Sequence, residues 1–398
     1  MPKRVAVVTT VYKYLSHAQH MADRFLVGYP HEGEWHQPDV KIVSLYVDQK
    51  PAGDPTNGGD QSAVRAQEFG FQVYPTIAEA LRCGTGKLAV DAVMIIGEHG
   101  DYPKNDKGQV LYPRYEFFKQ CVDVFEKDGR AVPVYNDKHL SYSFQKAKWM
   151  VDQSKRLKFP MLAGSSLPVT WRLPDLELPL SCEIEEALMV GVGGSDPMDY
   201  HALEAMQCMI ERRKGGETGV KAVQMIEGDA VWKVGEEGRY SKKLLTAALS
   251  RSDSPQGHTL VDGRTQDLVG NNELPKLVKN PAAYFIEHND GLRTTLLMLN
   301  GAIHDFCFAA KVKGIPGFPS TQFFLSPVPN VTYSACLVGK IEEMFTIGRA
   351  PYPVERTLIV SGALEACLTS RQKGQQRLET PELKVVYRAP KLPQHART

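Results

Sequence analysis

Ionisable side chains cluster just after two apolar runs in the first half of the chain. Asp137, Lys138 and His139 follow one run, and Glu98 and His99 follow another. Such runs are typical of parallel strands that are covered on both faces, and open α/β sheets bind ligands at the carboxyl ends of these strands. The residues are therefore candidates for acid–base chemistry or ligand binding. For Glu98 and His99, a metal site and a plain loop stay open as alternatives, although a metal would need ligands from elsewhere in the chain.

The turn after the first predicted strand contains no glycine. In a dinucleotide site, a glycine-rich turn lets the pyrophosphate approach the backbone at the start of a helix. Residues 9–17 instead supply the side chains of Thr9, Thr10, Tyr12, Lys13 and Ser16. We predict Thr9, Thr10 and Tyr12 as cofactor-binding residues. The alternative is a loop that binds no phosphate.

Asp48 stands at the end of the second predicted strand. An acidic residue at this place commonly holds a ribose diol in dinucleotide-binding folds. Because a carboxylate repels an extra phosphate, Asp48 would favour NAD over NADP. A turn-forming aspartate is the alternative.

The elements that must position these residues alternate along the chain. The sequence predicts strands at residues 4–9, 40–46, 91–97, 131–135 and 160–163, and helices at residues 16–26, 61–69, 76–83, 113–127 and 143–156. This alternation predicts a Rossmann-like α/β domain with a doubly wound parallel sheet for residues 1–164.

The chain changes character after Gly164, where three prolines between residues 168 and 179 mark an irregular crossing. We place a domain boundary there and predict that residues 165–398 form an α+β domain with an open mixed sheet. The sequence His-Asn-Asp-Gly at residues 288–291 is a strong hairpin signal. Predicted strands cover residues 219–226, 230–234, 282–287, 292–299, 305–312 and 322–325, and predicted helices cover residues 199–213 and 354–371.

The composition excludes several classes of protein. The 398 residues carry 47 Lys and Arg against 46 Asp and Glu, so there is no long-range field to attract nucleic acid or an anionic membrane. No apolar run approaches the roughly 18 residues that a membrane helix needs. The N-terminal segment has no room for a signal peptide, so we expect a cytoplasmic protein, although one from which an export signal had been removed would look the same.

No metal site is expected. The seven cysteines are scattered and odd in number, which fits neither a zinc site nor a disulfide framework. His17 and His20 lie three residues apart on the first predicted helix, but two histidines supply too few ligands, and a surface helix is the favoured interpretation.

Three motifs in order carry a resemblance to a known family. Val-Tyr-Pro-Thr-Ile-Ala-Glu-Ala-Leu at residues 73–81 precedes Val-Asp-Ala-Val-Met-Ile-Ile-Gly at residues 90–97, and Asn136-Asp137-Lys138 follow the next helix and strand. This order resembles the Gfo/Idh/MocA oxidoreductases, the glucose-fructose oxidoreductase and inositol dehydrogenase family. The similarity is clearest up to about Leu140 and returns faintly after residue 355. It departs from the family in lacking the glycine-rich turn and in having Asp137-Lys138-His139 where the family has Glu-Lys-Pro.

The resemblance implies roles for residues in both domains. Lys138 matches the family lysine that polarises the reacting oxygen beside the nicotinamide. Residues 193–201 loosely match a segment in which an Asp and a His open a helix, so His201 is the implied proton acceptor and Asp199 its catalytic partner, with Asp196 as the alternative carboxylate. Tyr200 is a further substrate-binding candidate. Glu98 and His99 lie where the family contacts the nicotinamide side of the cofactor.

Trp171 and Arg172 lie at the crossing between the domains, where a substrate would meet both. They suit a polar ring through stacking and hydrogen bonding, and interdomain packing is the alternative.

The implied activity is that of an NAD- or NADP-dependent oxidoreductase acting on a hydroxyl of a sugar, glycoside or cyclitol. The resemblance also implies a homo-oligomer that pairs through the open sheet face. Phe306, Phe308, Phe323 and Phe324 are candidates for this face, and ordinary core residues are the alternative. Because the turn lacks glycine, two other functions stay open. One is a redox-neutral lyase, hydratase or isomerase on the same scaffold, and the other is a non-catalytic binding protein.

Overall fold

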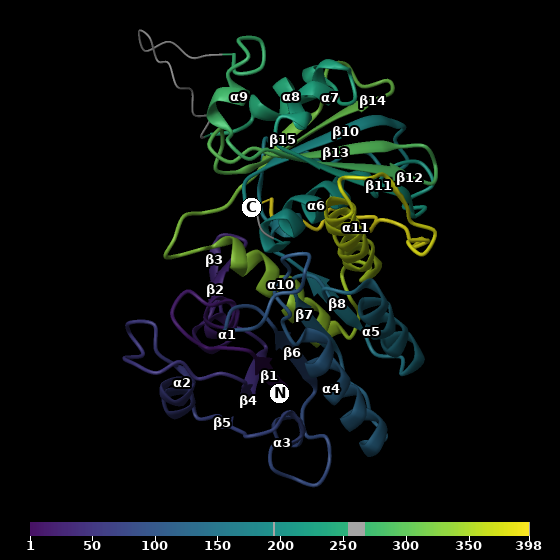
Figure 1. Ribbon diagram of the computed structural model, residues 1–398. Coiled ribbons are helices and arrows are strands. Elements are labelled where there is room, and N and C mark those ends of the chain that lie inside the picture. The colour runs from purple at the N-terminus through teal and green to yellow at the C-terminus, as the bar shows by residue number, and fades with distance from the viewer. Residues whose placement is uncertain (194–195, 254–266, 398) are drawn as a thin grey trace.

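The chain forms two β-sheets, one in the lower part and one in the upper part of Figure 1. The computed structural model describes residues 1–193, 196–253 and 267–397. Three helices, α6 (Asp196–Ile210), α10 (Tyr333–Ile347) and α11 (Glu355–Gln372), lie between the sheets (Figure 1).

The first sheet has six parallel strands in the order β5-β4-β1-β6-β7-β8. Its strands are β1 (Lys3–Thr9), β4 (Val40–Val47), β5 (Gln72–Val73), β6 (Ala92–Ile96), β7 (Val134–Asp137) and β8 (Met161–Gly164). Strands β4 and β5 extend the sheet on one side of β1, and β6, β7 and β8 then extend it on the other side. The strand order therefore reverses between β1 and β6, and ligands bind at the carboxyl ends of strands beside such a point.

Helices cover both faces of this sheet, so β6 is completely buried. They are α1 (His17–Val27), α2 (Ser62–Phe69), α3 (Ile77–Arg82), α4 (Arg114–Asp128) and α5 (Phe144–Arg156). Ser16 caps α1 and Thr76 caps α3, each accepting a hydrogen bond from an amide in the first turn. The predicted strands and helices of this half are confirmed to within a few residues.

The second sheet has eight strands in the order β16-β11-β12-β13-β10-β14-β15-β9. They are β9 (Arg172–Leu173), β10 (Ile184–Gly191), β11 (Val220–Glu227), β12 (Ala282–His288), β13 (Arg293–Met298), β14 (Phe306–Val312), β15 (Ser320–Phe323) and β16 (Leu378–Glu379). Only the β10 and β13 pair is parallel, so the sheet is mixed, and the predicted fold class is confirmed. The predicted hairpin at residues 288–291 joins β12 to β13.

One predicted strand is wrong. Residues 230–234 form part of helix α7 (Ala230–Glu236), because the buried positions Val231 and Gly235 are four apart, which is the helical period. The sequence also missed β10, helix α10 and the short hairpin of β2 (Tyr29–His31) and β3 (Glu34–His36). A short 3-10 helix, η1 (Leu167–Val169), occupies the proline-rich crossing.

The second sheet is covered on both faces by this chain's own helices. Phe306, Phe308 and Phe323 are fully buried on the face packed by α6 and α11. The other face packs against α7, α8 (Lys242–Leu249) and α9 (Leu274–Leu277). These phenylalanines therefore belong to the core and offer no surface for pairing, and the homo-oligomer stays a prediction.

The predicted boundary at Gly164 coincides with the end of β8, and the next strand belongs to the second sheet. However, α10 returns to pack on α1 and shares a core cluster with β1 and β4. The division at residue 164 thus stays a prediction. All seven cysteines are free thiols, and no helix in the described part of the chain is long and apolar enough to cross a membrane.

Gly164 offers a test of how the two halves are joined. Its φ is +123°, and a Cβ at this position would collide with the buried Glu204 carboxylate of α6. We expect Gly164→Ala to lower the free energy of unfolding by about 1–3 kcal/mol or more, because backbone strain and the collision add. Gly129→Ala is the matched control, since that glycine has a φ of +66° with nothing within 4 Å. Chemical denaturation measures both, and equal losses would contradict this account.

Candidate active site

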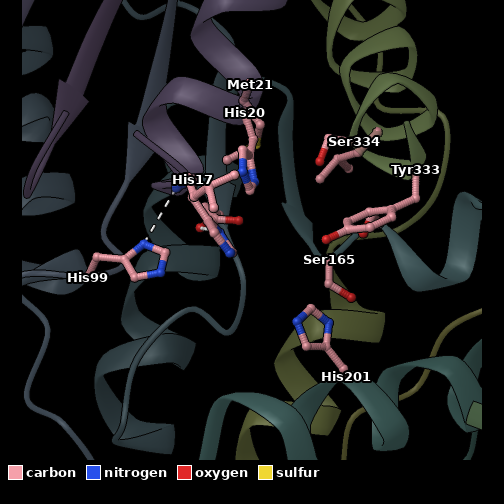
Figure 2. Close-up of a pocket in the computed structure, with 12 residues that line it drawn as sticks. His17, His20, Met21, His99, Ser165, His201, Tyr333 and Ser334 are labelled. Atoms are coloured by element: carbon pink, nitrogen blue, oxygen red, sulfur yellow. Dashed lines mark hydrogen bonds and ion pairs between the residues drawn. The ribbon is translucent and has the colours of Figure 1, made fainter. Parts of the chain in front are cut away.

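A cavity of about 190 Å³ opens where the carboxyl ends of the parallel strands meet the start of α6. Figure 2 shows His17 and His20 reaching in from α1, His201 from the other side, and Tyr333 and Ser334 from α10. The strand ends contribute His99 after β6, Asp137 at the end of β7, and Ser165 and Ser166 after β8. The cavity therefore lies beside the point where the strand order reverses.

Lys138 and His201 meet at this site. The Lys138 Nζ lies 2.6 Å from the Nε2 of His201, although one residue follows β7 and the other lies on α6. Lys138 has a φ of 59°, in the left-handed region that non-glycine residues rarely adopt. Its amide donates to the Gly164 carbonyl at 3.2 Å, so the neighbouring strand helps to fix this conformation.

Burial and the Lys138 cation lower the pKa of His201 well below its usual value. The ring is therefore neutral at pH 7, and its Nε2 lone pair accepts a hydrogen bond from the Lys138 ammonium. The remaining hydrogen lies on Nδ1, which has no hydrogen-bond partner among the described residues.

Glu98 supplies the nearest negative charge to Lys138. Its Oε1 lies 3.9 Å from the Lys138 Nζ, and its Oε2 accepts from the Arg114 guanidinium. Burial alone would raise the pKa of the Glu98 carboxyl, but Lys138 and Arg114 outweigh burial and lower the pKa to about 2. Glu98 is therefore a permanent anion held between two buried cations.

The buried network continues into the second domain. Arg114 Nη1 lies 3.3 Å from His139 Nε2, which in turn lies 3.3 Å from the Asp196 carboxylate. Burial opposes ionisation of Asp196, but His139 and further partners lower its pKa. Because Asp196 is the first residue of α6, the network ties the helix that carries His201 to the first sheet.

Three more histidines line the cavity or border it from α1 and the loop after β6. His17 Nδ1 lies 2.7 Å from the Asp137 carboxylate, and the His17 amide donates to His99 Nδ1 at 3.4 Å. Burial, and then the charge of His17, lowers the pKa of His99 to about 4 and that of His20 to about 3. Both rings are neutral at pH 7.

The predicted catalytic residues are brought together only in part. Lys138 and His201 are in contact, but the Asp199 carboxylate accepts from the buried Tyr284 hydroxyl on β12. Two residues along a helix turn a side chain by about 200°, so Asp199 and His201 point to different sides of α6. Asp199 therefore lies beneath the site, and the carboxylate that α6 contributes to the polar network is Asp196.

The predicted cofactor residues on the first turn face the core. Thr9 donates to the Ile96 carbonyl at 3.0 Å, Thr10 to the Glu98 carbonyl at 2.7 Å, and Tyr12 to Asp23 at 2.6 Å. All three are almost completely buried and are not at the cavity. Asp48 is exposed, and its two oxygens accept from Tyr46 at 2.8 Å and Tyr102 at 2.7 Å. Of the six predicted cofactor residues, only His99 lines the cavity, with Glu98 behind it.

The predicted substrate residues also lie outside the cavity. Arg172 is buried against Glu177 and the Leu176 carbonyl. Trp171 borders a separate hollow near the C-terminus. Tyr200 lies under the cavity floor, where its hydroxyl donates to Glu204 at 2.8 Å. Arg172 and Tyr200 therefore make internal contacts, whereas Trp171 borders the separate hollow, and substrate binding by the three residues stays a prediction.

Sequence reasoning missed several residues that do line the cavity. His17 and His20 point into it, where a surface helix was the favoured interpretation. The signal was their position: α1 begins where β1 ends, so its first turn lies at the carboxyl edge of the sheet. Ser165 and Ser166 follow the end of β8 and carry the same signal, whereas Tyr333 and Ser334 gave none, because they lie 168 residues further along the chain. No group of three potential metal ligands occurs among the described residues, although the chain has four cavity or near-cavity histidines.

Comparisons with known proteins define the fold. No family model matches the sequence, and no curated relative matches it. Solved structures match nearly the whole chain. Myo-inositol dehydrogenase from Lactobacillus casei, in complex with NAD(H) and myo-inositol, is 11% identical with a TM-score of 0.55, covering 96% of this chain and 97% of its own. Myo-inositol 2-dehydrogenase from Lactobacillus plantarum is 12% identical with a TM-score of 0.54, covering 95% and 99%.

GenD2 from gentamicin A biosynthesis, in complex with NAD, is 13% identical with a TM-score of 0.54, covering 96% of this chain and 97% of its own. The chain therefore has the two-domain fold of the Gfo/Idh/MocA oxidoreductases, and the fold that the sequence resemblance implied is confirmed. Because the sequence identities are this low, the similarity to these structures establishes the fold alone.

The buried network predicts a strong response to loss of its central anion. We expect Glu98→Gln to lower the free energy of unfolding by about 3–5 kcal/mol, because Lys138 and Arg114 would remain buried without their shared carboxylate. The matched control is Glu126→Gln, an exposed carboxylate paired with Arg156, for which we expect a change below about 1 kcal/mol. Urea denaturation at pH 7 measures both, and a small loss in Glu98→Gln would show that the charges are screened.

Proposed function

We propose that the protein is an oxidoreductase that acts on a hydroxyl of a sugar, glycoside or cyclitol, with NAD or NADP as the hydride carrier. The observation that carries the proposal is the contact between Lys138 and His201 at a cavity beside the strand-order reversal. The solved structures of the same fold include dehydrogenases bound to NAD, and one of these also holds myo-inositol.

The two residues suit complementary tasks on one substrate oxygen. The Lys138 ammonium, which now donates to His201, can donate to that oxygen and stabilise the negative charge that develops on it. The neutral His201 then has a free Nε2 lone pair to accept the hydroxyl proton. NAD or NADP, when bound, would accept the hydride from the carbon that carries this oxygen. The serines of the loop after β8 and the hydroxyl of Tyr333 supply polar groups for the rest of a polyol.

Several amides of the first turn already have partners within the chain. Ser16 Oγ accepts from the amides of Lys13 at 3.1 Å and Gln19 at 3.3 Å, and His99 accepts from the amide of His17. A separate hollow of about 450 Å³ borders the same turn. Lys13, Gln49 and Lys50 are among the residues that line it. Lysine ammonium groups are established phosphate ligands. The residues present thus fit a dinucleotide through lysine side chains in place of backbone amides.

The same occupied amides favour a second candidate function. A redox-neutral enzyme on this scaffold, such as a lyase, hydratase or isomerase, needs acid–base groups around a polyol but no pyrophosphate cradle. Lys138 and His201 would then act on a carbonyl or hydroxyl without net oxidation. Nicotinamide binding separates the two candidates.

We expect NAD or NADP to raise the unfolding temperature, with a stabilisation of about 2.7 kcal/mol at a hundredfold excess over Kd. The double variant Lys13→Ala, Lys50→Ala should weaken this effect, whereas Lys41→Ala, on the exposed side of β4, should not. Differential scanning fluorimetry with NAD, NADH, NADP and NADPH measures binding without any turnover. If none of the four changes the unfolding temperature, the oxidoreductase proposal fails and the redox-neutral candidate takes its place.

The Lys138 charge also predicts how His201 titrates. Because burial and Lys138 lower the pKa of His201, its ring should stay neutral down to well below pH 6.5, the ordinary value. Lys138→Met removes the cation, so the pKa of His201 should rise and protonation should begin at higher pH. Carbon-13 NMR of the labelled imidazole follows the titration, with Lys119→Met, an exposed lysine paired with Asp123, as the control. An unchanged His201 titration in Lys138→Met would contradict the contact.

A further inference from the structure

We propose that His17 and Asp137 form a second acid–base pair in the cavity, which removes a proton from the carbon next to a carbonyl in a keto sugar or keto cyclitol. His17 is the catalytic residue, and Asp137 is a positioning residue. The proposal rests on the proposed function in one respect, because such a ketone is the product of oxidising a polyol hydroxyl.

The geometry of the pair fixes which nitrogen faces the cavity. His17 Nδ1 lies 2.7 Å from Asp137 Oδ2, and the Asp137 side chain is only 2% exposed. A carboxylate can only accept hydrogen bonds, so in the neutral ring Nδ1 carries the hydrogen and Nε2 keeps its lone pair. No hydrogen bond to His17 Nε2 occurs in the described part of the chain, and the side chain is 24% exposed where it lines the cavity. Nε2 is therefore available to a ligand.

Asp137 is held in place by its own surroundings. The Tyr135 hydroxyl lies 3.5 Å from its second oxygen and donates to the Gly164 carbonyl at 3.1 Å. Asp137 pairs with Gly164 of β8 in the parallel sheet, so its backbone is fixed on one side as well. A rigid carboxylate behind an imidazole sets both the tautomer and the ring orientation of the histidine.

Two of the four histidines that line the cavity have opposite partners. His201 contacts the ammonium of Lys138, whereas His17 contacts the carboxylate of Asp137. An imidazolium at His17 would have its charge balanced by Asp137, but one at His201 would face a cation. The end of the cavity at His201, where Lys138 is in contact, therefore suits negative charge on a substrate oxygen, and His17 suits a base that accepts and holds a proton. Figure 2 shows the two rings entering from different sides.

The step balances without an oxidant. The C–H bond next to the carbonyl breaks, and its proton forms a bond to His17 Nε2. The electron pair forms the carbon–carbon double bond of an enolate, whose oxygen bears the negative charge against Lys138. Return of a proton from His17 to the carbon restores the ketone. In heavy water, the proton on His17 exchanges with solvent, so the returned ketone carries deuterium.

Hydrogen exchange in heavy water tests the proposal directly. The 398-residue chain is incubated with 2-keto-myo-inositol and, separately, with 3-keto-glucose, and mass spectrometry measures the deuterium gained. We expect exchange with at least one ketone, a loss of about a hundredfold or more in His17→Gln, and a smaller loss in Asp137→Asn. The control is His31→Gln, since that histidine is 44% exposed and lies outside the cavity. Absence of exchange by the unmodified chain, or full exchange by His17→Gln, overturns the proposal.

A second measurement tests the geometry without turnover. Nitrogen-15 NMR of labelled histidine should show the hydrogen of neutral His17 on Nδ1, and Asp137→Asn should alter this tautomer. A hydrogen on Nε2 in the unmodified protein would overturn the proposal even if the variants failed to fold. Neither measurement requires a nicotinamide. Hydrogen exchange without nicotinamide binding would support the acid–base role of His17 and Asp137 and contradict the oxidoreductase function. Hydride transfer without hydrogen exchange would support the oxidoreductase function and contradict that acid–base role.

Discussion

A buried ammonium group is the constraint on which the rest of the site depends. Lys138 is only 3% exposed, and its charge lies at the boundary between the two domains. Removing a lysine from water costs several kcal/mol unless opposite charges and hydrogen bonds compensate. Glu98 provides the anion, but it also contacts Arg114, which is itself 1% exposed. Arg114 in turn lies against His139, whose other neighbour is Asp196. Two cations and two anions thus form one buried set, which explains why residues from β6, α4, β7 and α6 converge at one place.

This set also explains how one chain builds a site from two domains. Asp196 is the first described residue of α6, and His201 lies little more than one turn further along. Once Asp196 is held by His139, the first turns of α6 are held against the end of β7. The position of His201 over Lys138 follows from helical geometry. On the other side, the Glu204 carboxylate binds the amide and hydroxyl of Ser165 at 2.7 and 2.8 Å, which fixes the loop after β8 to the same helix.

The parallel sheet could be predicted from the sequence because its strands are short apolar runs and its helices begin at recognisable caps. Lys138 could be predicted for the same reason, since the end of a strand is a defined place in such a sheet. The sequence could not show the partners of Trp171, Arg172 and Tyr200, because a buried polar residue and a ligand-facing one look alike until their partners are known. Asp196 and Asp199 are a second example. Both lie in the first turn of α6, and only the packing of the helix decides which carboxylate joins the buried network of Glu98, Arg114 and His139. The cavity wall from α10 was beyond prediction, because it depends on a segment that returns from the second sheet to pack on α1.

The first turn is where the chain departs most from the expectation for its fold, and the departure has a physical consequence. In a glycine-rich turn, the helix amides are left open for an anionic ligand. Here a histidine occupies the first helical position, its amide is bound by His99, and its ring is bound by Asp137. The edge of the sheet that would otherwise present backbone donors therefore presents an imidazole nitrogen with a lone pair. With Lys138 in contact with His201, the cavity has one histidine backed by a cation and another backed by a carboxylate. That polarity favours a substrate whose oxygen gains negative charge as a proton leaves the neighbouring atom, whether or not a hydride leaves as well.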